Sequence, residues 1–591
     1  MSLEADTEHE GKFEDQSEAE IKNKRSNLAV GIEDIPSWPQ LILLGLQITI
    51  SIIGSQVYLP ILLADILCLR DDVVLISKII SATFFIQGIT TLLQVTFGIR
   101  LPITQGASFS YIPPAIALMT YYGDCSTGEG QQQNGTLTQT DESSKIRLAE
   151  VNGGLLVASL IEVLIGVTGI ISIIMRFIGP ISVAPVIILL GISLSRIAWS
   201  NCHPSWGVAL FTAGLVILFS QILKNVKVPM IGIKKGKGLY VVRTRLFLKF
   251  SMFLSIMSGW LLSYILTVTN VFSDDPSERT YNARTDISNE VFNNTRWITF
   301  PYPGQIVWPK FTIAAFFGML AAVIASIVES LGDYSACSTM CEVPTPPSHA
   351  INRGIAIEGL GGMLSGIWGT GTGTASYSSN VVVIGITKVA SRRVMQVVGV
   401  ILIILAFIQI ICSFLSTLPD PVIGGTLLAK TGMIISIGIS LLQKIDLNSS
   451  RNMFVLGLAL CFGICLPDYM QENPGVINTG LPTFDSSVSI LLETGIFVGF
   501  VVAVFFDNVI PGTKEERGLT QNKASSLEDT MEGGESQNET DAALRCYDFP
   551  FGMNAIRRSK FAQYIPISPT YRACRKTKQK SIKRKPHTVE D

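Results

Sequence analysis

The sequence predicts an all-α polytopic membrane protein, and its composition, its apolar runs and its segregated charges all indicate this fold class. Hydrophobic residues make up 48% of the 591-residue chain and charged residues 15%, with a mean hydropathy of +0.42. Soluble domains usually carry about 25% charged residues. The net charge of -1 hides charges that crowd into the two ends and a few loops. This distribution indicates a chain embedded in a lipid bilayer and argues against a nucleic-acid partner.

Apolar runs of membrane-spanning length predict about fourteen transmembrane segments. The clear runs lie near residues 41–64, 75–97, 151–175, 207–223, 247–270, 311–331, 394–416, 452–467 and 487–507. Other runs are shorter or rich in Gly, Pro, Ser and Thr, and they lie near 103–119, 181–198, 355–369, 372–388 and 422–442. An even number of crossings places both ends of the chain on the same side of the membrane.

Basic loops orient the chain. The segment 224–249 carries Lys and Arg but no acidic residue, and Lys388, Arg392 and Arg393 form a similar cluster. Cytoplasmic loops carry such an excess of Lys and Arg, so we expect both regions, and both ends of the chain, in the cytoplasm. The residues Met1–Lys24 are acidic and polar, which does not indicate a cleavable signal peptide.

The opposite loops, near 120–150 and 271–310, are more acidic and are expected to face outward. They carry glycosylation sequons at Asn134 and Asn293. Cys125 and Cys202 are expected on the same side, and the sequence does not decide whether they form a disulfide.

The run boundaries predict a division of the chain into tails, repeats and one long loop. The divisions are a disordered cytoplasmic N-terminal tail (1–38), a first seven-segment repeat (39–270), an extracellular loop (271–310), a second seven-segment repeat (311–510) and a cytoplasmic C-terminal tail (511–591).

Weak internal symmetry supports these two repeats. Gly106–Tyr111 resembles Gly373–Ser378, and both are small, hydroxyl-rich and aromatic stretches inside interrupted segments. Similarly, Pro185–Ile187 opens the fifth predicted crossing and Pro421–Ile423 the twelfth. Because a unit with an odd number of crossings inserts its second copy upside down, the two halves are expected to be inverted. Interrupted segments at equivalent places in inverted halves indicate a transporter's midplane site.

A polar stretch interrupts the apolar pattern between residues 329 and 393. Glu329 and Asp333 are four residues apart, so they lie on one face of a helix. Gly369–Asn380 is rich in Gly, Thr and Ser and is a poor continuous helix. Ionisable side chains and broken helices at membrane depth occur where they line a cavity or are buried in protein. This region is therefore the candidate functional site.

Other ionisable residues in the spans carry weaker signals. Interior hydrogen bonding or interfacial positions account for Glu162, Glu358 and Glu493. No metal site is predicted, because Cys337, Cys341 and His349 have no fourth ligand nearby in the sequence. Motifs for phosphate loops, nucleophile elbows and dinucleotide binding are absent from the sequence, so no enzyme activity is expected.

Short motifs spread along the chain carry a family resemblance. They are Gly31–Pro36, Glu329–Tyr334, His349–Gly354, Ser379–Asn380 with Thr387–Lys388, and Leu418–Pro421. With these motifs the chain resembles the nucleobase/ascorbate transporter family, of the xanthine/uracil permease type. Further stretches make it similar to the animal branch, which holds sodium-dependent vitamin C and nucleobase transporters. These are Asn448–Asn452, Asn473–Asn478 and Pro511–Gly518.

The resemblance implies a fold of inverted repeats with a core domain, a gate domain and usually a homodimer. The core would contain the first four crossings of each half, and the gate the last three. It also implies a short strand and a half-helix in the third and tenth crossings, with the half-helix N-termini directed at the substrate. Substrate binding is implied for Glu329, Ser108, Phe109, Ser110, Ser379 and Asn380, and cation coupling for Asp333 and Thr387.

The chain departs from the family pattern at three places. The tenth-crossing signature of the family begins with Gln, Glu or Pro and has Gly at its fourth position, where this chain has Ser379 and Val382. Many relatives have Gln-His in the first crossing, whereas here Gln47 is followed by Ile48. These residues leave the substrate open between ascorbate and a nucleobase.

The resulting hypothesis is a plasma-membrane symporter of ascorbate or a nucleobase, driven by Na⁺ and without a cofactor. Ascorbate is favoured because the Gln or Glu typical of nucleobase recognition is missing. Two alternatives stay open: a carrier-fold sensor or assembly partner that does not transport, and a sodium-independent anion exchanger or channel.

Overall fold

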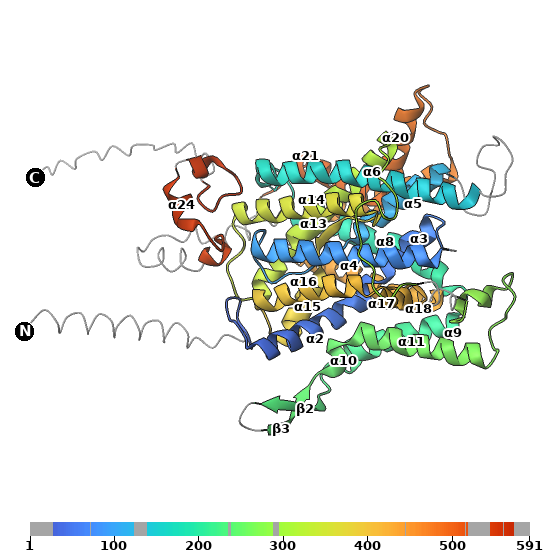
Figure 1. Ribbon diagram of the computed structural model, residues 1–591. Coiled ribbons are helices and arrows are strands. Elements are labelled where there is room, and N and C mark those ends of the chain that lie inside the picture. The colour runs from blue at the N-terminus through green and yellow to red at the C-terminus, as the bar shows by residue number, and fades with distance from the viewer. Residues whose placement is uncertain are drawn as a thin grey trace, which may run out of the picture.

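A computed structural model describes residues 28–70, 72–122, 139–175, 177–234, 238–287, 295–443, 445–513, 516–517, 544–559 and 561–571. The predicted sequons at Asn134 and Asn293 lie outside the described residues. Figure 1 shows a bundle of long helices that run roughly side by side, with the β2–β3 hairpin projecting from one end.

The first half of the chain forms the following elements: α2 (Trp38–Gln56), α3 (Tyr58–Ile66), α4 (Val73–Thr96), β1 (Gln105–Ala107), η1 (Phe109–Tyr111), α5 (Ile112–Tyr122), α6 (Gln139–Thr168), α7 (Ile171–Ile174), α8 (Pro180–Cys202), α9 (Trp206–Ile217), η2 (Leu218–Ile222), β2 (Val228–Lys234), β3 (Gly238–Thr244), α10 (Leu246–Lys249) and α11 (Ser251–Val268).

The second half forms η3 (Arg279–Ala283), α13 (Ile313–Met340), α14 (Ser348–Trp368), β4 (Thr374–Ser376), α15 (Ser378–Thr387), α16 (Arg392–Phe407), α17 (Gln409–Ser416), α18 (Asp420–Leu442), α19 (Ser450–Glu472), α20 (Pro482–Glu493) and α21 (Gly495–Val509). The C-terminal segment adds η4 (Arg545–Tyr547), α24 (Met553–Arg558) and η5 (Phe561–Tyr564).

Every predicted apolar run coincides with one or more of these elements, but fewer runs than expected are full spans. Eight helices of the described chain are long and apolar enough to cross a membrane, or nine if α20 and α21, bent by 78°, count as one. Five predicted runs give no full span by themselves: 207–223 and 394–416 are each divided between two shorter helices, 355–369 lies in α14, and the other two are interrupted runs. Gly, Ser and Thr end the helical pattern there, so 103–119 forms β1, η1 and α5, and 372–388 forms β4 and α15.

The two short strands pair with each other across the middle of the chain. In β1 and β4 the register is antiparallel, with Gln105 opposite Ser376 and Gly106 opposite Ala375. Gly106 is required here, because a Cβ atom would lie 2.6 Å from the ring of Tyr377. Both strands are fully buried. The two stretches that resemble each other in sequence therefore meet in the interior.

Helix packing repeats with the same offset as the sequence. α4 packs on α16, and α6 packs on α14. In the predicted repeats α4 is equivalent to α14 and α6 to α16, so replacing each helix by its equivalent in the other repeat turns the first pair into the second. The same exchange relates α9–α18 to α8–α19 and α9–α11 to α19–α21, and it maps α8–α18 onto itself. This exchange of contacts is expected when two similar halves are related by a two-fold axis.

The N-terminal tail is ordered over part of the region predicted to be disordered. Val30 pairs with Val389, and the backbone amide of Ala29 donates to the carbonyl of Lys388. These backbone hydrogen bonds fix residues 28–37, so the predicted disorder of 1–38 is wrong for that part. Low hydrophobicity alone did not reveal a partner that lies far along the chain.

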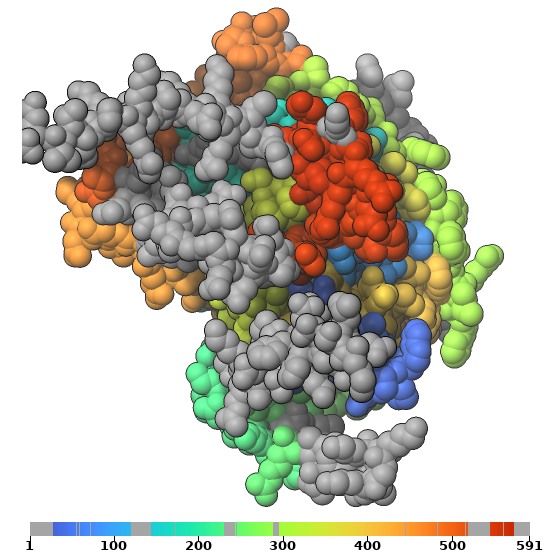
Figure 2. All heavy atoms as spheres, turned by 90° about the vertical axis from the view of Figure 1, so that its left-hand side faces the viewer, coloured from blue at the N-terminus to red at the C-terminus, as the bar shows by residue number. Residues whose placement is uncertain are grey.

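The C-terminal segment 544–571 also packs on the bundle, at the end from which the β2–β3 hairpin projects (Figures 1 and 2). Arg353 Nη2 donates to the carbonyl of Tyr547 at 2.6 Å and Arg392 Nη1 to that of Cys546 at 3.0 Å. The Tyr547 side chain is fully buried, and its hydroxyl donates to the carbonyl of Pro344. Burial raises the pKa of the Cys546 thiol to about 11, so this cysteine is neutral at physiological pH.

Cys125 lies outside the described residues, and Cys202 is a free, buried cysteine, so the disulfide that the sequence left open does not involve Cys202. It packs at the end of α8 against α18, where Gly424 approaches its backbone. Cys68 is disulfide-bonded.

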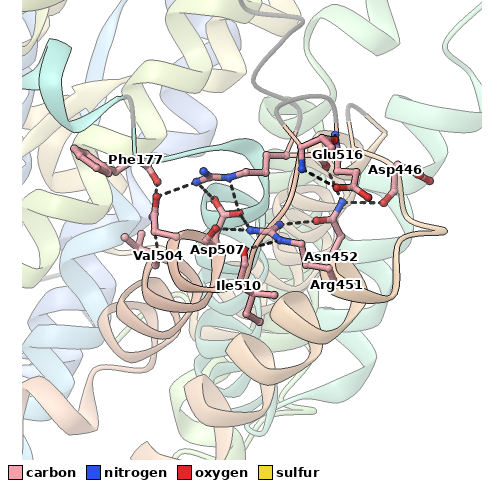
Figure 3. Close-up of polar contacts among 11 residues, drawn as sticks. Phe177, Asp446, Arg451, Asn452, Val504, Asp507, Ile510 and Glu516 are labelled. Atoms are coloured by element: carbon pink, nitrogen blue, oxygen red, sulfur yellow. Dashed lines mark hydrogen bonds and ion pairs between the residues drawn. The ribbon is translucent and has the colours of Figure 1, made fainter.

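A buried carboxylate joins the start of α19, the end of α21 and the segment that follows α21 (Figure 3). Asp507 is fully buried and forms ion pairs with Arg451 at 2.8 Å and with Arg517 at 3.0 Å. Asn452 donates to the carbonyls of Asp446 and Glu516 at 2.9 and 2.7 Å. The family motifs at Asn448–Asn452 and Pro511–Gly518 therefore contain the residues of one structural network.

We expect Asp507→Ala to destabilise the protein strongly, because two partly buried arginines lose their shared counter-charge. Breaking a buried pair by removing one partner costs about 3–5 kcal/mol. The measurement is the apparent Tm of the purified protein in detergent. Asp468→Ala is the control, since Asp468 pairs with Arg196 at an exposed site with side chains 38% and 56% accessible. That change should cost about 1 kcal/mol or less, and equal shifts in the two variants would contradict the prediction.

Candidate functional site

The candidate site is built around Glu329, which is half-buried on α13 beside η1. One carboxylate oxygen accepts hydrogen bonds from Ser108 Oγ at 3.0 Å and Ser110 Oγ at 3.1 Å. Both serines are at least nine-tenths buried. Three residues predicted from separate parts of the sequence therefore meet at one carboxylate.

The start of a half-helix holds these serines in place. Ser108 is the N-cap of η1, and its Oγ accepts a hydrogen bond from the backbone amide of Ser110 at 3.2 Å. The chain continues through η1 into α5. Helix N-termini carry free amides and partial positive charge, which stabilise a negative group nearby. The carboxylate of Glu329 thus lies at a favourable place for its charge.

A buried lysine faces this cluster from α18. Lys430 is 7% exposed, and its Nζ lies 4.2 Å from the ring centroid of Phe109. The same Nζ donates to the hydroxyl of Tyr377 at 3.2 Å and attracts Glu329 electrostatically. A cation over an aromatic face contributes about 2 kcal/mol or more when desolvated. The site therefore combines one carboxylate, one ammonium group and two aromatic rings.

Asp333 lies one helical turn beyond Glu329 on α13 and contacts the other half-helix. Its Oδ2 accepts a hydrogen bond from Ser378 Oγ at 2.9 Å, and Ser378 begins α15. The two carboxylates thus contact the two interrupted segments, Glu329 at η1 and Asp333 at α15. This arrangement follows from the paired strands, which bring both segments to α13.

The remaining predicted residues occupy different positions on α15. Ser379 is half-buried in its first turn. Asn380 is fully buried, and its Nδ2 donates to the carbonyl of Pro102 at 3.0 Å, before β1. Thr387 lies at the far end of the helix, where its Oγ1 donates to the carbonyl of Val383 at 2.8 Å. The structure therefore brings Asn380 to the loop before β1 and leaves Thr387 away from Asp333.

Two departures from the family pattern have simple structural settings. The Val382 side chain is 56% exposed, so its branched group does not obstruct a close backbone approach. Ile48 is 1% exposed on α2 and belongs to the apolar core.

A cavity of about 420 Å³ is lined by residues of α3, α5, α8, α19 and α20. Pro113 and Ile116 of α5 line it, together with Arg196 and Asp468. Glu329 and Lys430 are not among its lining residues. Pro113 and Ile116, on the half-helix that follows Phe109, are the lining residues that come nearest in sequence to the candidate site.

The sequence did not predict Lys430 and Tyr377 as residues of the functional site. A signal for Lys430 was present, because it is a single lysine in the apolar run 422–442, and ionisable residues inside spans mark functional sites. Tyr377 gave no such signal, since an aromatic residue in an apolar region is usually packed in the core. Among the described residues no group of three or more His, Cys, Asp or Glu side chains is arranged to hold a metal ion.

Comparison with known proteins identifies the family. The sequence pattern of the permease family, the xanthine/uracil permeases, matches residues 39–472. The chain belongs to this family. It is a multi-pass membrane transport protein and not an enzyme.

Similar proteins cover nearly the whole chain. Solute carrier family 23 member 1 of Mus musculus is 42% identical over 93% of this chain and 90% of its own length. Solute carrier family 23 member 2 of Homo sapiens is 42% identical over 94% of this chain and 84% of its own. Nucleobase-ascorbate transporter 1 of Arabidopsis thaliana is 30% identical over 83% of this chain and 90% of its own.

Two solved structures are more distantly similar. The transmembrane domain of the cyanobacterial bicarbonate transporter BicA has a TM-score of 0.45 and 13% identity, covering 80% of this chain and all of that domain. The murine anion transporter Slc26a9 gives the same TM-score and identity over 80% of this chain and 69% of its own.

We expect Asn380→Ala to lower stability, because the buried carbonyl of Pro102 would lose its donor. Such an unsatisfied group costs about 1–3 kcal/mol. The apparent Tm in detergent measures this loss. Asn473→Ala is the matched control: Asn473 also donates to a backbone carbonyl, of Tyr469 at 2.9 Å, but at an exposed helix end. A loss in the control as large as that in Asn380→Ala would contradict the interpretation.

Proposed function

We propose that this protein is a sodium-coupled symporter that carries ascorbate across the plasma membrane. The observation that carries the proposal is the position of Lys430 beside Phe109 and Tyr377, opposite Glu329 and its two serines. A flat, hydroxyl-rich monoanion matches this set of groups. Its charge suits the ammonium group, its ring suits the aromatic faces, and its hydroxyls suit the serines and the carboxylate.

Charge balance supports coupling to a cation. Without solute, the positive charge of Lys430 compensates the negative charge of Glu329, and both side chains lie in a poorly solvated place. An entering monoanion adds a negative charge that this pair does not neutralise. A cation that enters with the anion removes the imbalance, and Asp333 offers a second carboxylate within one turn. A neutral nucleobase creates no such requirement, so the arrangement favours ascorbate.

The proposed mechanism uses a core and a gate built from two inverted halves of seven segments. The core contains α2–α6 and α13–α17, and the gate contains α8–α11 and α18–α21. Glu329 and Phe109 belong to the core and Lys430 to the gate, so the solute would bind at their boundary. Movement of the core along the gate would carry the solute across the bilayer. A homodimer, cytoplasmic ends, and glycosylation at Asn134 and Asn293 complete the proposal.

The proposal predicts sodium-dependent uptake of labelled ascorbate, above that of uracil and hypoxanthine, in cells that express the chain. Replacing Na⁺ by choline should reduce ascorbate uptake roughly 5–150-fold, the usual range of coupling between sites. Glu329→Gln should abolish uptake, because it removes the negative charge that interacts with Lys430 while it keeps an oxygen that accepts hydrogen bonds from Ser108 and Ser110. Uptake of uracil or hypoxanthine in place of ascorbate would assign a nucleobase as the substrate. Absence of uptake despite surface expression would favour a sensor or assembly partner. Uptake at the same rate with and without Na⁺ would favour an exchanger or channel.

A second prediction concerns the lysine. Lys430→Gln should raise the KM for ascorbate about 10–100-fold, because a hydrogen bond to a charged group contributes about 1.5–3 kcal/mol. Lys224→Gln is the control, since Lys224 is exposed in a loop. Concentration-dependent uptake measures both variants. An unchanged KM in Lys430→Gln would assign the lysine to packing between core and gate.

A further inference from the structure

A second carboxylate cluster lies in the interior, apart from the candidate solute site. Glu162 of α6 is 0% exposed, and neither of its oxygens has a hydrogen-bond partner among the described residues. An ionised carboxylate without donors is very costly in the protein interior, so such groups are normally paired or coordinate a cation. Glu162 therefore requires an explanation that the solute site does not supply.

The nearest charged group makes the requirement stronger. Glu162 interacts electrostatically with Glu358 of α14, which is also 0% exposed. One oxygen of Glu358 accepts hydrogen bonds from Ser376 Oγ at 2.5 Å, Tyr334 OH at 2.8 Å and Gln105 Nε2 at 3.3 Å. These donors stabilise its negative charge, and its other oxygen has no partner among the described residues. Two carboxylates thus interact in the interior, and hydrogen bonds stabilise only that of Glu358.

Three buried hydroxyl groups lie on the elements that pack around Glu162. Tyr111 of η1 interacts with Glu162 and lies beside Ser326 of α13. Ser159 lies one turn before Glu162 on α6, facing Gly362 of α14. All three hydroxyls are buried and without a hydrogen-bond partner among the described residues. Glu162 thus interacts electrostatically with Glu358 of α14 and with Tyr111 of η1, which lies beside Ser326 of α13, so carboxylate and hydroxyl oxygens of four elements belong to one buried cluster.

The helices bring this cluster together by unusually close packing. A Cβ atom on Gly359 would lie 2.6 Å from the backbone nitrogen of Val163, and Gly362 leaves room only for Ser159. A Cβ atom on Gly373 would lie too close to the hydroxyl of Tyr111, so a glycine is needed there for the ring to fit. Small residues that let helix backbones approach are typical of tightly packed membrane helices. The oxygen atoms are thus held by rigid elements.

We propose that Glu162, Tyr111, Ser326 and Glu358 form a Na⁺ site, separate from the solute site around Glu329. The identity of the ion as Na⁺ rests on the proposed function, whereas the position of the site rests on the buried cluster of oxygens. A hard monovalent cation prefers carboxylate and hydroxyl oxygens, and one positive charge compensates the carboxylate that lacks donors. No Lys or Arg of the described residues forms an ion pair with Glu162 or Glu358.

The position of this site connects the ion to the solute through β1 and β4. Glu358 accepts hydrogen bonds from Gln105 of β1 and Ser376 of β4. Tyr111 belongs to the same η1 helix as Phe109 and Ser110, next to Glu329. An ion at Glu162 would therefore fix the two half-helices from behind. Ordering them before the solute arrives would raise the affinity for the solute.

The test uses the purified full-length protein in detergent, without any solute. Thermal unfolding and ²²Na⁺ binding are measured in NaCl and in choline chloride at the same ionic strength. Na⁺ should raise the apparent Tm of the unmodified protein, since a ligand that binds only the folded state stabilises it. Glu162→Gln should lose this response, and Tyr111→Phe and Ser326→Ala should require roughly 10-fold more Na⁺.

Two controls separate this site from the solute site. Glu329→Gln should keep the Na⁺ response while losing uptake, and Glu472→Gln, an exposed carboxylate at the end of α19, should keep both. If Glu162→Gln does not fold, Tyr111→Phe and Ser326→Ala decide the question, because each removes one oxygen. A full Na⁺ response in the three site variants would overturn the proposal. So would an unmodified protein that ignores Na⁺ and is stabilised only by acid, which would assign a proton to Glu162. A missing solute uptake with an intact Na⁺ response would reject the proposed function alone.

Discussion

The hydrogen bonding between β1 and β4 is the constraint on which the rest of the structure depends. At membrane depth a broken helix leaves backbone groups that neither water nor lipid can satisfy. Two segments far apart in the sequence solve this together, since each supplies the partner that the other lacks. The pairing leaves half-helices on both sides, and these begin at Ser108 and Ser378, beside the carboxylates of α13. Polar chemistry in the interior is therefore a consequence of how the backbone is satisfied.

Charge compensation is the second organising feature. Asp507 neutralises two arginines at one end of the bundle, whereas Lys430 and Glu329 oppose each other across the proposed boundary of two domains. The first arrangement is fully hydrogen-bonded and fixes helix ends. The second combines groups from elements that the proposed mechanism moves past each other. A lone intramembrane lysine that interacts with an aromatic ring and a distant carboxylate is suited to binding, because its partners change when the solute enters.

Local pattern predicted the apolar runs, of which eight or nine form full spans among the described residues, and it predicted the two interrupted segments. Glu329, Ser108 and Ser110 were proposed together only through the family resemblance, and the structure shows them in contact. The sequence did not predict the contact between Lys430 and Phe109, since α18 and η1 are brought together only by packing of whole helices. The same holds for Asn380, whose partner is a backbone carbonyl without any signature. Residues 28–37 and 544–571 were assigned to tails, because composition does not record a distant partner such as Arg353.

The position of the C-terminal segment has a consequence for measuring motion. Its hydrogen bonds reach α14, α16 and the loop after α13, all of which belong to the proposed core. The preceding helix α21 belongs to the proposed gate, where Asp507 holds it. The two ends of the connection between Arg517 and Leu544 are thus attached to bodies that would shift relative to each other. A fluorescent label placed after Tyr571 would report on the position of the core, and a label near Arg517 would report on the position of the gate. The distance between the two labels would therefore measure the proposed movement of the core along the gate.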